Sequence, residues 1–206
     1  MITLQSLTSC KAVLFDLDGV LVDSYDCWFH LVNDLLTEQG KRALSKLEFD
    51  QTWGQAPDAD REELFPEWSL QDLMDCYDRR FPDYVKWSKP EPGSVEFLQK
   101  LRLSQKKVAV ASNSPTVVVE LLLQNAGARD FVDLAIGVDQ VEKGKPEPDL
   151  LLKALQRLKL DRKKVCYVGD SVFDEQAAKA AGIFFVGYKR PGDISVQSFE
   201  QLADLL

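Results

Sequence analysis

Short apolar runs alternate with helical patterns along most of the chain. The pattern predicts strands over Lys11–Phe15, Lys107–Ala111, Leu134–Val138, Val165–Val168 and Ile183–Val186. It predicts helices over Ser94–Leu103, Thr116–Asn125, Glu147–Leu158, Phe173–Ala181 and Val196–Leu206. Strands that alternate with helices in this way are typical of the α/β class, here a three-layer Rossmann-like core with a mostly parallel sheet.

One stretch breaks the alternation, because it contains no convincing strand and two helical patterns, Tyr25–Gln39 and Leu70–Arg80. We therefore predict an inserted α-helical cap domain at residues 23–88 and a core domain formed by residues 1–22 and 89–206. All four tryptophans fall in the insert, and we interpret them mainly as its hydrophobic core: Trp28, Trp53, Trp68 and Trp87. Contact of Trp53 with a substrate is the less favoured interpretation.

Composition narrows the classes of function. The 206 residues carry a net charge of −8, which argues against nucleic acid or an anionic membrane as the main partner. No apolar stretch approaches the ~20 residues of a membrane span. The residues before the first predicted strand lack the pattern of a signal peptide. The four cysteines are scattered without a CxxC pair, so we expect reduced thiols and a cytoplasmic location.

Polar side chains follow the predicted strands at the edge where an open parallel sheet binds ligands. Asp16 and Asp18 follow the first strand, Ser112 follows the second, and Asp170 follows the fourth. Several carboxylates in one crevice repel each other, and a bound Mg²⁺ ion would offset that repulsion. With the ammonium group of Lys145 and the hydroxyl of Ser112, such a crevice suits a phosphoryl group. One carboxylate could then attack phosphorus while another moves the proton.

Each of these motifs has an ordinary structural explanation when it stands alone. Asp-Gly is a frequent turn, Ser-Pro often begins a helix, and an isolated lysine is usually solvated. We favour the catalytic interpretation because the motifs occur together, in order, at junctions between strands, loops and helices.

The set of motifs resembles the haloacid dehalogenase (HAD) superfamily of phosphohydrolases, in the subfamily with a helical C1-type cap. The motif DxDx[TV] matches Asp16–Val20, and the Ser or Thr after an apolar strand matches Ser112. The Lys before PxP matches Lys145, and GDxxxD matches residues 169–174. The resemblance covers nearly the whole chain, and the insert matches the cap by position and type.

The resemblance implies a role for each matched residue. Asp16 would be the nucleophile, and Asp18 would be the general acid and base with its backbone carbonyl on Mg²⁺. Ser112 would bind the transferring phosphoryl group with help from Asn113, and Lys145 would steady that group and the nucleophile. The metal ligands would be Asp16, Asp18 and Asp170, with Asp174 binding directly or through water.

Within the family, we expect a Mg²⁺-dependent phosphatase that acts on a small phosphorylated metabolite, as in the phosphoglycolate-phosphatase-like members. A sugar-phosphate mutase of the β-phosphoglucomutase type is an alternative, although Trp28 stands where such members tend to carry a histidine. A non-catalytic binding member is a further alternative, and the intact motifs speak against it. The general acid at Asp18 argues against a dehalogenase, and Lys41 and Lys46 give little support to a phosphonatase.

The sequence does not identify the leaving group, which cap side chains would select. The segment from Gln51 to Pro57 is a candidate substrate loop, and a plain turn is an equal alternative. Arg42 and Arg61 are candidate partners for an anionic leaving group, although most arginines on an acidic protein are solvated. We expect the protein to be a monomer or a homodimer.

Overall fold

The core of the molecule is a six-stranded sheet in the order β5-β4-β1-β6-β7-β8, seen in a computed structural model that describes residues 9–206. Every neighbouring pair of strands in it is parallel, which confirms the predicted α/β class. The strands are β1 Ala12–Phe15, β4 Lys107–Ala111, β5 Leu134–Ile136, β6 Val165–Gly169, β7 Phe184–Tyr188 and β8 Ile194–Val196.

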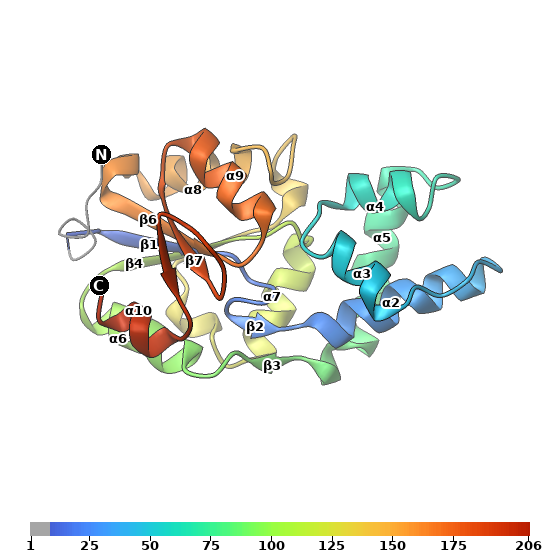
Figure 1. The fold of residues 1–206 in the computed structure, drawn as a ribbon, viewed down its shortest axis with the longest axis horizontal. Helices are drawn as coiled ribbons and strands as arrows, with labels where there is room; N and C mark the ends of the chain where they lie inside the picture. The colour runs from blue at the N-terminus through green and yellow to red at the C-terminus, as the bar shows by residue number, and fades with distance from the viewer. Residues whose placement is uncertain (1–8) are drawn as a thin grey trace.

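Helices cover both faces of the sheet (Figure 1). On one face lie α6 Ser94–Leu103, α7 Thr116–Asn125 and α10 Phe199–Ala203; on the other lie α8 Asp149–Leu158 and α9 Val172–Ala181. Alternate residues of β1 serve the two faces, because Val13 and Phe15 join one hydrophobic cluster while Ala12 and Leu14 join the other. The central strand is therefore fully buried, and its carboxyl end opens into the site described below.

A helical unit projects from one end of the sheet (Figure 1). It lies between β2 Val22–Asp23 and β3 Lys89–Pro90, which pair antiparallel, and we call its residues 24–88 the cap segment. Its helices are α2 Tyr25–Glu38, α3 Lys46–Thr52, α4 Pro57–Glu63 and α5 Leu70–Arg80, followed by short 3-10 turns at Phe81–Asp83 and Val85–Trp87. The division into domains at residues 22 and 89 stays a prediction.

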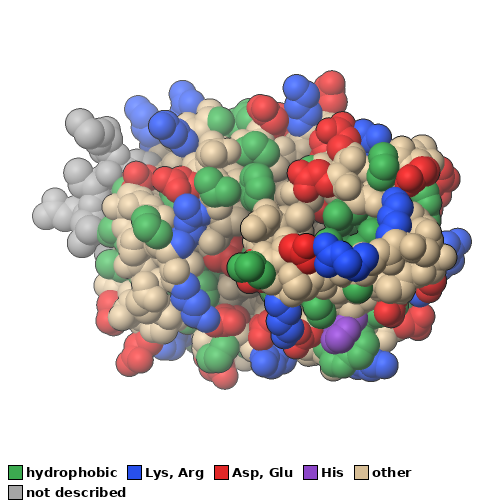
Figure 2. Space-filling model, turned by 45° about the vertical axis from the view of Figure 1, so that its right-hand side comes forward, with side chains coloured by type: hydrophobic (Ala, Val, Ile, Leu, Met, Phe, Trp, Pro, Cys, Tyr) green, Lys and Arg blue, Asp and Glu red, His purple; other side chains and the backbone are tan. Residues whose placement is uncertain are grey.

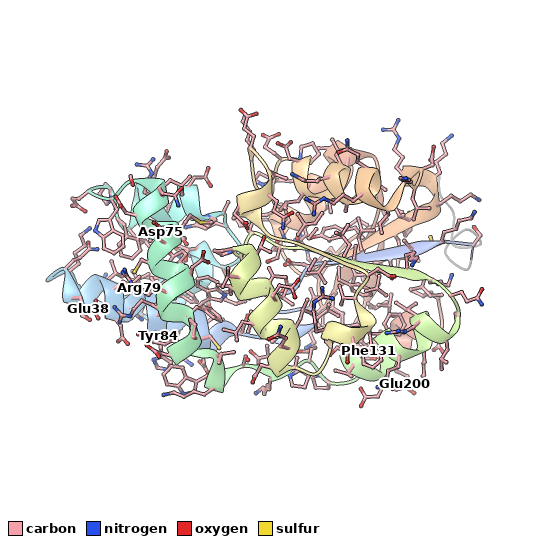
Figure 3. The ribbon with its side chains drawn as sticks, turned by 180° about the vertical axis from the view of Figure 1, so that it is seen from behind. Glu38, Asp75, Arg79, Tyr84, Phe131 and Glu200 are labelled. Carbon is pink, nitrogen blue, oxygen red and sulfur yellow. The ribbon has the colours of Figure 1, made fainter. Side chains whose placement is uncertain are left out.

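Ion pairs join the outer parts of this cap segment. Glu38, seen near the outer end of α2 in Figure 3, accepts hydrogen bonds from the guanidinium of Arg80 on α5 at 2.9 and 3.0 Å. Tyr84 donates to Asp34 of α2 at 2.7 Å. These contacts fix α5 against α2 and thereby shape the cavity between the cap segment and the sheet.

Further 3-10 turns connect the elements of the core: Arg129–Phe131, Val138–Gln140 and Arg162–Lys164.

The structure also corrects the sequence prediction in several places. The strands β2 and β3 are two residues long each, which is too short for a hydrophobic period to show. The predicted helix over 196–206 was wrong at its start, because Val196 belongs to β8 and Ser198 caps a helix that begins at Phe199.

The cap segment contains two helices that the prediction lacked, α3 and α4. The first begins with a capping box between Ser45 and Glu48, and the second has Pro57 in its first turn. Both are seven residues long, so each shows only about two turns of hydrophobic period. The capping box and the proline that begin these helices can be seen in the sequence, even though the hydrophobic period within each helix is weak.

The tryptophans divide between packing and surface. Trp28, Trp53 and Trp68 pack against the main hydrophobic cluster. Trp87 is 41% exposed, so the interpretation as core was wrong for that residue. All four cysteines are buried thiols that form no disulfide. Within residues 9–206, no helix combines the length and the apolar character that a bilayer crossing requires.

Candidate active site

A buried ion-pair cluster lies at the carboxyl end of the sheet. The ammonium group of Lys145 lies 2.7 Å from Oδ1 of Asp16 and 2.7 Å from Oδ1 of Asp174. The three side chains are at most 6% exposed. Asp16 is placed there by the end of β1, and its backbone N–H donates to the Val168 carbonyl of β6. Lys145 is therefore the lysine of the site, whereas the neighbouring Lys143 is exposed.

Asp174 is held in place by local structure. Ser171 caps α9, and its hydroxyl and backbone N–H both donate to Oδ2 of Asp174. The hydroxyl of Tyr167 donates to Oδ1 at 2.6 Å. Burial alone would raise the pKa of Asp174, but the charge of Lys145 and these hydrogen bonds hold it below its usual range. Asp174 is thus an ionised carboxylate whose oxygens already have donors.

Asp170 adds a further carboxyl group, for which the charge of Lys145 does not offset burial. One carboxylate oxygen each of Asp16, Asp170 and Asp174 lie within 4.8 Å of one another. Burial and the charge of Asp174 raise the pKa of Asp170 to about 7, and burial raises the pKa of Asp16 well above its usual range. Among the described residues, Oδ1 of Asp170 is buried without a hydrogen-bond partner.

The cluster of Asp16, Asp170 and Asp174 fits a divalent cation. An unpartnered buried oxygen and carboxylates that repel each other are what a hard cation with oxygen ligands would stabilise. The backbone also closes in on the same point, because a Cβ atom at Gly19 would lie 2.1 Å from Oδ2 of Asp170. Gly19 has a φ of +78°, a conformation that favours glycine. The residues that the sequence proposed for Mg²⁺ thus include a set that can hold it.

The carboxylate of Asp18 lies among hydrogen-bond donors from the cap segment and the core. Its carboxylate accepts from Trp28 Nε1 at 3.0 Å, from Ser114 at 2.8 Å and from Ser112 at 3.2 Å, and also from the hydroxyl of Ser24. These donors come from the cap helix α2 and its N-cap and from the loop after β4. The carboxylate is fixed in one orientation beside the nucleophile candidate, as a proton-transfer group requires.

Asn113 links the catalytic loops to the cap segment. Its side-chain oxygen accepts from the backbone N–H of Lys145 at 2.7 Å. Its amide donates to the carbonyls of Lys145 and Gly54, each at 3.0 Å. These bonds position Lys145 and hold the cap loop at Gly54 over the core. Whether Asn113 also binds substrate stays a prediction.

A pocket between the core and the cap segment is lined by Asp16, Asp18 and Lys145 of this site, whereas Asp170 and Asp174 are not among its lining residues. Its empty space is about 540 Å³, including the open mouth. The core side presents the catalytic candidates Asp16, Asp18, Ser112, Asn113, Ser114 and Lys145. The cap side presents Trp28, Val32, Phe49, Thr52, Trp53, Gly54, Gln55, Pro57, Asp60 and Tyr77. The predicted substrate loop lies at this pocket, since most of its residues line it.

Several side chains that support the site were not predicted from the sequence. Ser24 and Trp28 bind Asp18, and Tyr167 and Ser171 bind Asp174. Ser171 had a signal, because it stands three residues before an acidic residue in a capping box. Tyr167 carried none, because a tyrosine within a buried strand is usually simple packing.

The Ser-Pro pair at residues 114 and 115 precedes helix α7, but the first amide of that helix is not directed at the catalytic groups. Helix α7 begins at Thr116, and the backbone N–H of Thr116 donates to Asp139 at 2.7 Å. Ser114 contributes its hydroxyl to Asp18 instead. The hydroxyls of the loop after β4, and not the first amide of α7, thus face the catalytic groups.

The fold and the site define an α/β enzyme class with an acidic catalytic crevice under a helical cap. A sequence model of the family described as haloacid dehalogenase-like hydrolase matches residues 13–188. A phosphoglycolate phosphatase of Rhodobacter capsulatus is 34% identical in an alignment of 185 positions that covers 86% of this chain and 83% of that protein. A bifunctional riboflavin kinase/FMN phosphatase of Arabidopsis thaliana is 30% identical, over 87% of this chain and 48% of that protein.

A crystal structure of a HAD-superfamily hydrolase, subfamily IA, from Geobacter sulfurreducens has the same arrangement. It superposes with a TM-score of 0.78 at 25% identity, over 96% of this chain and 100% of that one. The chain belongs to the haloacid dehalogenase-like hydrolases and is an enzyme of their phosphatase group.

Proposed function

We propose that the protein is a Mg²⁺-dependent phosphomonoester hydrolase that works through an aspartyl-phosphate on Asp16. The observation that supports this most directly is the buried cluster of Asp16, Lys145 and Asp174, with both ion-pair distances at 2.7 Å, at the floor of a pocket shared with Asp18. A nucleophile, a fixed cation and a proton-transfer group are thus within reach of one ester.

The reaction follows from these positions in two halves. Asp16 attacks phosphorus, the bond from phosphorus to the leaving oxygen breaks, and Asp18 protonates that oxygen. Asp18 then takes a proton from water as the water oxygen attacks phosphorus, and the bond from phosphorus to Asp16 breaks. Lys145 and the hydroxyl of Ser112 stabilise the phosphoryl oxygens through both halves.

The metal would be held by the carboxylates of Asp16 and Asp170 and by the backbone carbonyl of Asp18. When bound, Mg²⁺ would offset the charge of these carboxylates and of the phosphoryl oxygens. The oxygens of Asp174 already accept from Lys145, Tyr167 and Ser171, which supports a contact through water for that residue.

The relatives do not decide the substrate, because their names refer to phosphate esters as different as phosphoglycolate and FMN. We propose a small phosphorylated metabolite, turned over in the cytoplasm by a monomer or a homodimer.

Release of phosphate from p-nitrophenyl phosphate tests the proposal. We expect release with Mg²⁺, loss of it with a chelator, inhibition by Ca²⁺ and abolition in Asp16→Asn. Asp23→Asn is the matched control, because Asp23 is a nearby carboxylate on β2 whose partner is Lys89. Activity that persists in Asp16→Asn would contradict the mechanism. Isomerised product from sugar phosphates, without free phosphate, would instead indicate a mutase.

A further inference from the structure

The cap side of the pocket combines aromatic walls with a single charged side chain. Among the described residues, the cap segment lines the pocket with the rings of Trp28, Phe49, Trp53 and Tyr77 and with one ionisable carboxyl group, that of Asp60. The one cationic side chain in the described lining is Lys145, which is already committed to Asp16 and Asp174. A leaving group in this pocket therefore meets negative charge and π faces.

Asp60 is held by neutral donors on both of its oxygens. Gln55 Nε2 donates to Oδ1 at 2.7 Å, and the hydroxyl of Tyr77 donates to Oδ2 at 2.9 Å. Within residues 9–206, no lysine or arginine forms an ion pair with it; the adjacent Arg61 pairs with Glu62. Each oxygen keeps a lone pair for a further donor, so the carboxylate is oriented but its charge is not neutralised.

The two candidate arginines of the cap segment are not among the residues that line the pocket. Arg42 forms a bidentate pair with Glu48, and neither Arg42 nor Arg61 belongs to the described pocket lining. Figure 2 shows basic side chains on the outer surface interspersed with acidic ones. The cap segment thus offers no positive group in the described pocket lining that would bind a carboxylate on the leaving group.

A chain of contacts places Asp60 along the same wall as the catalytic acid. Trp28 donates to Asp18 at 3.0 Å, and its ring packs edge-on against Tyr77 at a centroid distance of 5.1 Å. Tyr77 in turn donates to Asp60. Asp18 and Asp60 are therefore linked through the rings of Trp28 and Tyr77, and both line the pocket that would hold the leaving group.

From these contacts we propose that the cap segment selects phosphate monoesters whose leaving group carries a cationic nitrogen, and that Asp60 is the residue that makes this choice. The inference rests on the proposed hydrolase function and adds a substrate class to it. A cationic nitrogen would be attracted both by the carboxylate and by the ring faces. A leaving group with a carboxylate would bring a like charge toward Asp60 in a pocket where water screens it poorly.

The protonation state of Asp60 agrees with this assignment. Burial raises the pKa of Asp60 to about 6, and the hydrogen bonds from Gln55 and Tyr77 oppose that rise. The group is therefore largely ionised at neutral pH, and a cation beside it would favour ionisation further.

Two matched ester series test the proposal with the full chain and Mg²⁺. The short series is aminoethyl, hydroxyethyl and carboxymethyl phosphate, and the longer series is aminopentyl, hydroxypentyl and carboxybutyl phosphate. We expect kcat/KM to fall from ammonium to hydroxyl to carboxylate, by about tenfold or more between the two charged esters. The longer series should show the larger effect if the nitrogen must reach Asp60.

The variants separate the charge of Asp60 from its structural contacts. Asp60→Asn should reduce the ammonium-to-carboxylate ratio to within a few-fold of one. Tyr77→Phe removes a hydrogen bond but keeps the charge, so it should keep the order of the esters. Asp58→Asn removes an exposed carboxylate from the same helix and should also keep the order. An unchanged ratio in Asp60→Asn, or a preference for the carboxylate esters, overturns the proposal.

Binding measured by calorimetry in Asp16→Asn provides a readout that does not need turnover. The ammonium esters should bind more tightly than the carboxylate esters, and the added substitution Asp60→Asn should remove the difference. If no ester releases phosphate, p-nitrophenyl phosphate included, the proposed function fails, while this binding order still decides the role of Asp60. If esters are hydrolysed without the expected order, only the inference about Asp60 fails.

Discussion

The indole N–H of Trp28 donates to the carboxylate of Asp18 across 3.0 Å, and this bond joins the first helix of the cap segment to the end of the central strand. The indole ring of Trp28 also packs against two other rings, with centroid distances of 5.1 Å to Tyr77 and 4.7 Å to Phe81. One side chain thus orients the proposed general acid and ties that orientation to the position of the cap segment.

Trp28→Phe should lower kcat by on the order of tenfold while the unfolding midpoint changes little. The variant keeps an aromatic ring for packing but removes one donor from Asp18. Steady-state kinetics and thermal unfolding measure the two effects. Trp68→Phe is the control, because Trp68 packs on Phe65 and is absent from the described pocket lining. A kcat equal to that of the wild type would show that the indole N–H does not position Asp18.

Lys145→Met should abolish activity and lower the free energy of unfolding by about 3–5 kcal/mol. The substitution leaves Asp16 and Asp174 buried side by side without the cation that separates them. Urea unfolding without Mg²⁺ measures the loss. Lys143→Met, at an exposed position two residues away, should change stability by less than about 0.5 kcal/mol. Equal effects of the two substitutions would refute the structural role given to Lys145.

A comparison of Gly19→Ala with Gly40→Ala distinguishes the cost of backbone strain from that of a steric clash with the candidate metal ligand Asp170. Both glycines have positive φ, +78° and +73°, so both substitutions should cost about 1 kcal/mol of stability. A Cβ at Gly19 would meet Oδ2 of Asp170, whereas one at Gly40 meets nothing within 4 Å. We therefore expect only Gly19→Ala to lose Mg²⁺-dependent activity. An active Gly19→Ala enzyme would argue against the tight approach of this loop to Asp170.

Asp60→Asn should stabilise the protein at neutral pH but not in acid. The pKa of Asp60 is about 6 in the folded chain against 3.8 in the unfolded chain. Between these values the folded state keeps a proton that the unfolded state has lost, so stability falls as pH rises through this window and stays reduced above it. The variant does not ionise there, so its stability relative to the wild type should increase by about 3 kcal/mol between acid and neutral pH.

Urea unfolding of both proteins on either side of this window measures the change in their difference. Asp58→Asn serves as the control, because Asp58 is exposed and its substitution should give no comparable growth. A difference between wild type and Asp60→Asn that is the same in acid and at neutral pH would contradict the pKa given to Asp60.

Much of the core could be predicted because its signals are local. The helices over Ser94–Leu103 and Thr116–Asn125 were predicted to the residue, since their apolar period and their flanking Pro or Gly residues lie within the same stretch. The strand Lys107–Ala111 was likewise predicted in full. The short helices α3 and α4 were missed because seven residues give a weak period.

In the site, too, residues with a local sequence signal were predicted, whereas residues that depend on tertiary packing were not. The order of Asp16, Ser112, Lys145 and Asp170 along the chain, each at the end of a strand or the start of a helix, was enough to predict the acidic crevice. The contacts of Trp28 with Asp18 and of Tyr167 with Asp174 were not predictable, because each joins elements whose relative placement depends on packing. Asp60 gave no signal, because an acidic residue in the first turns of a helix is usually solvated.

The sequence by itself determined the α/β class, the strand ends that carry Asp16, Asp18, Ser112 and Asp170, and the helical character of the insert, because apolar period and turn residues act over neighbouring positions. Only the tertiary structure decided which cap side chains face the crevice. A helix has several faces, and the one that turns toward Asp18 is set by how α2, α4 and α5 pack on each other and on the core. That packing places Trp28, Tyr77 and Asp60 on one wall of the pocket.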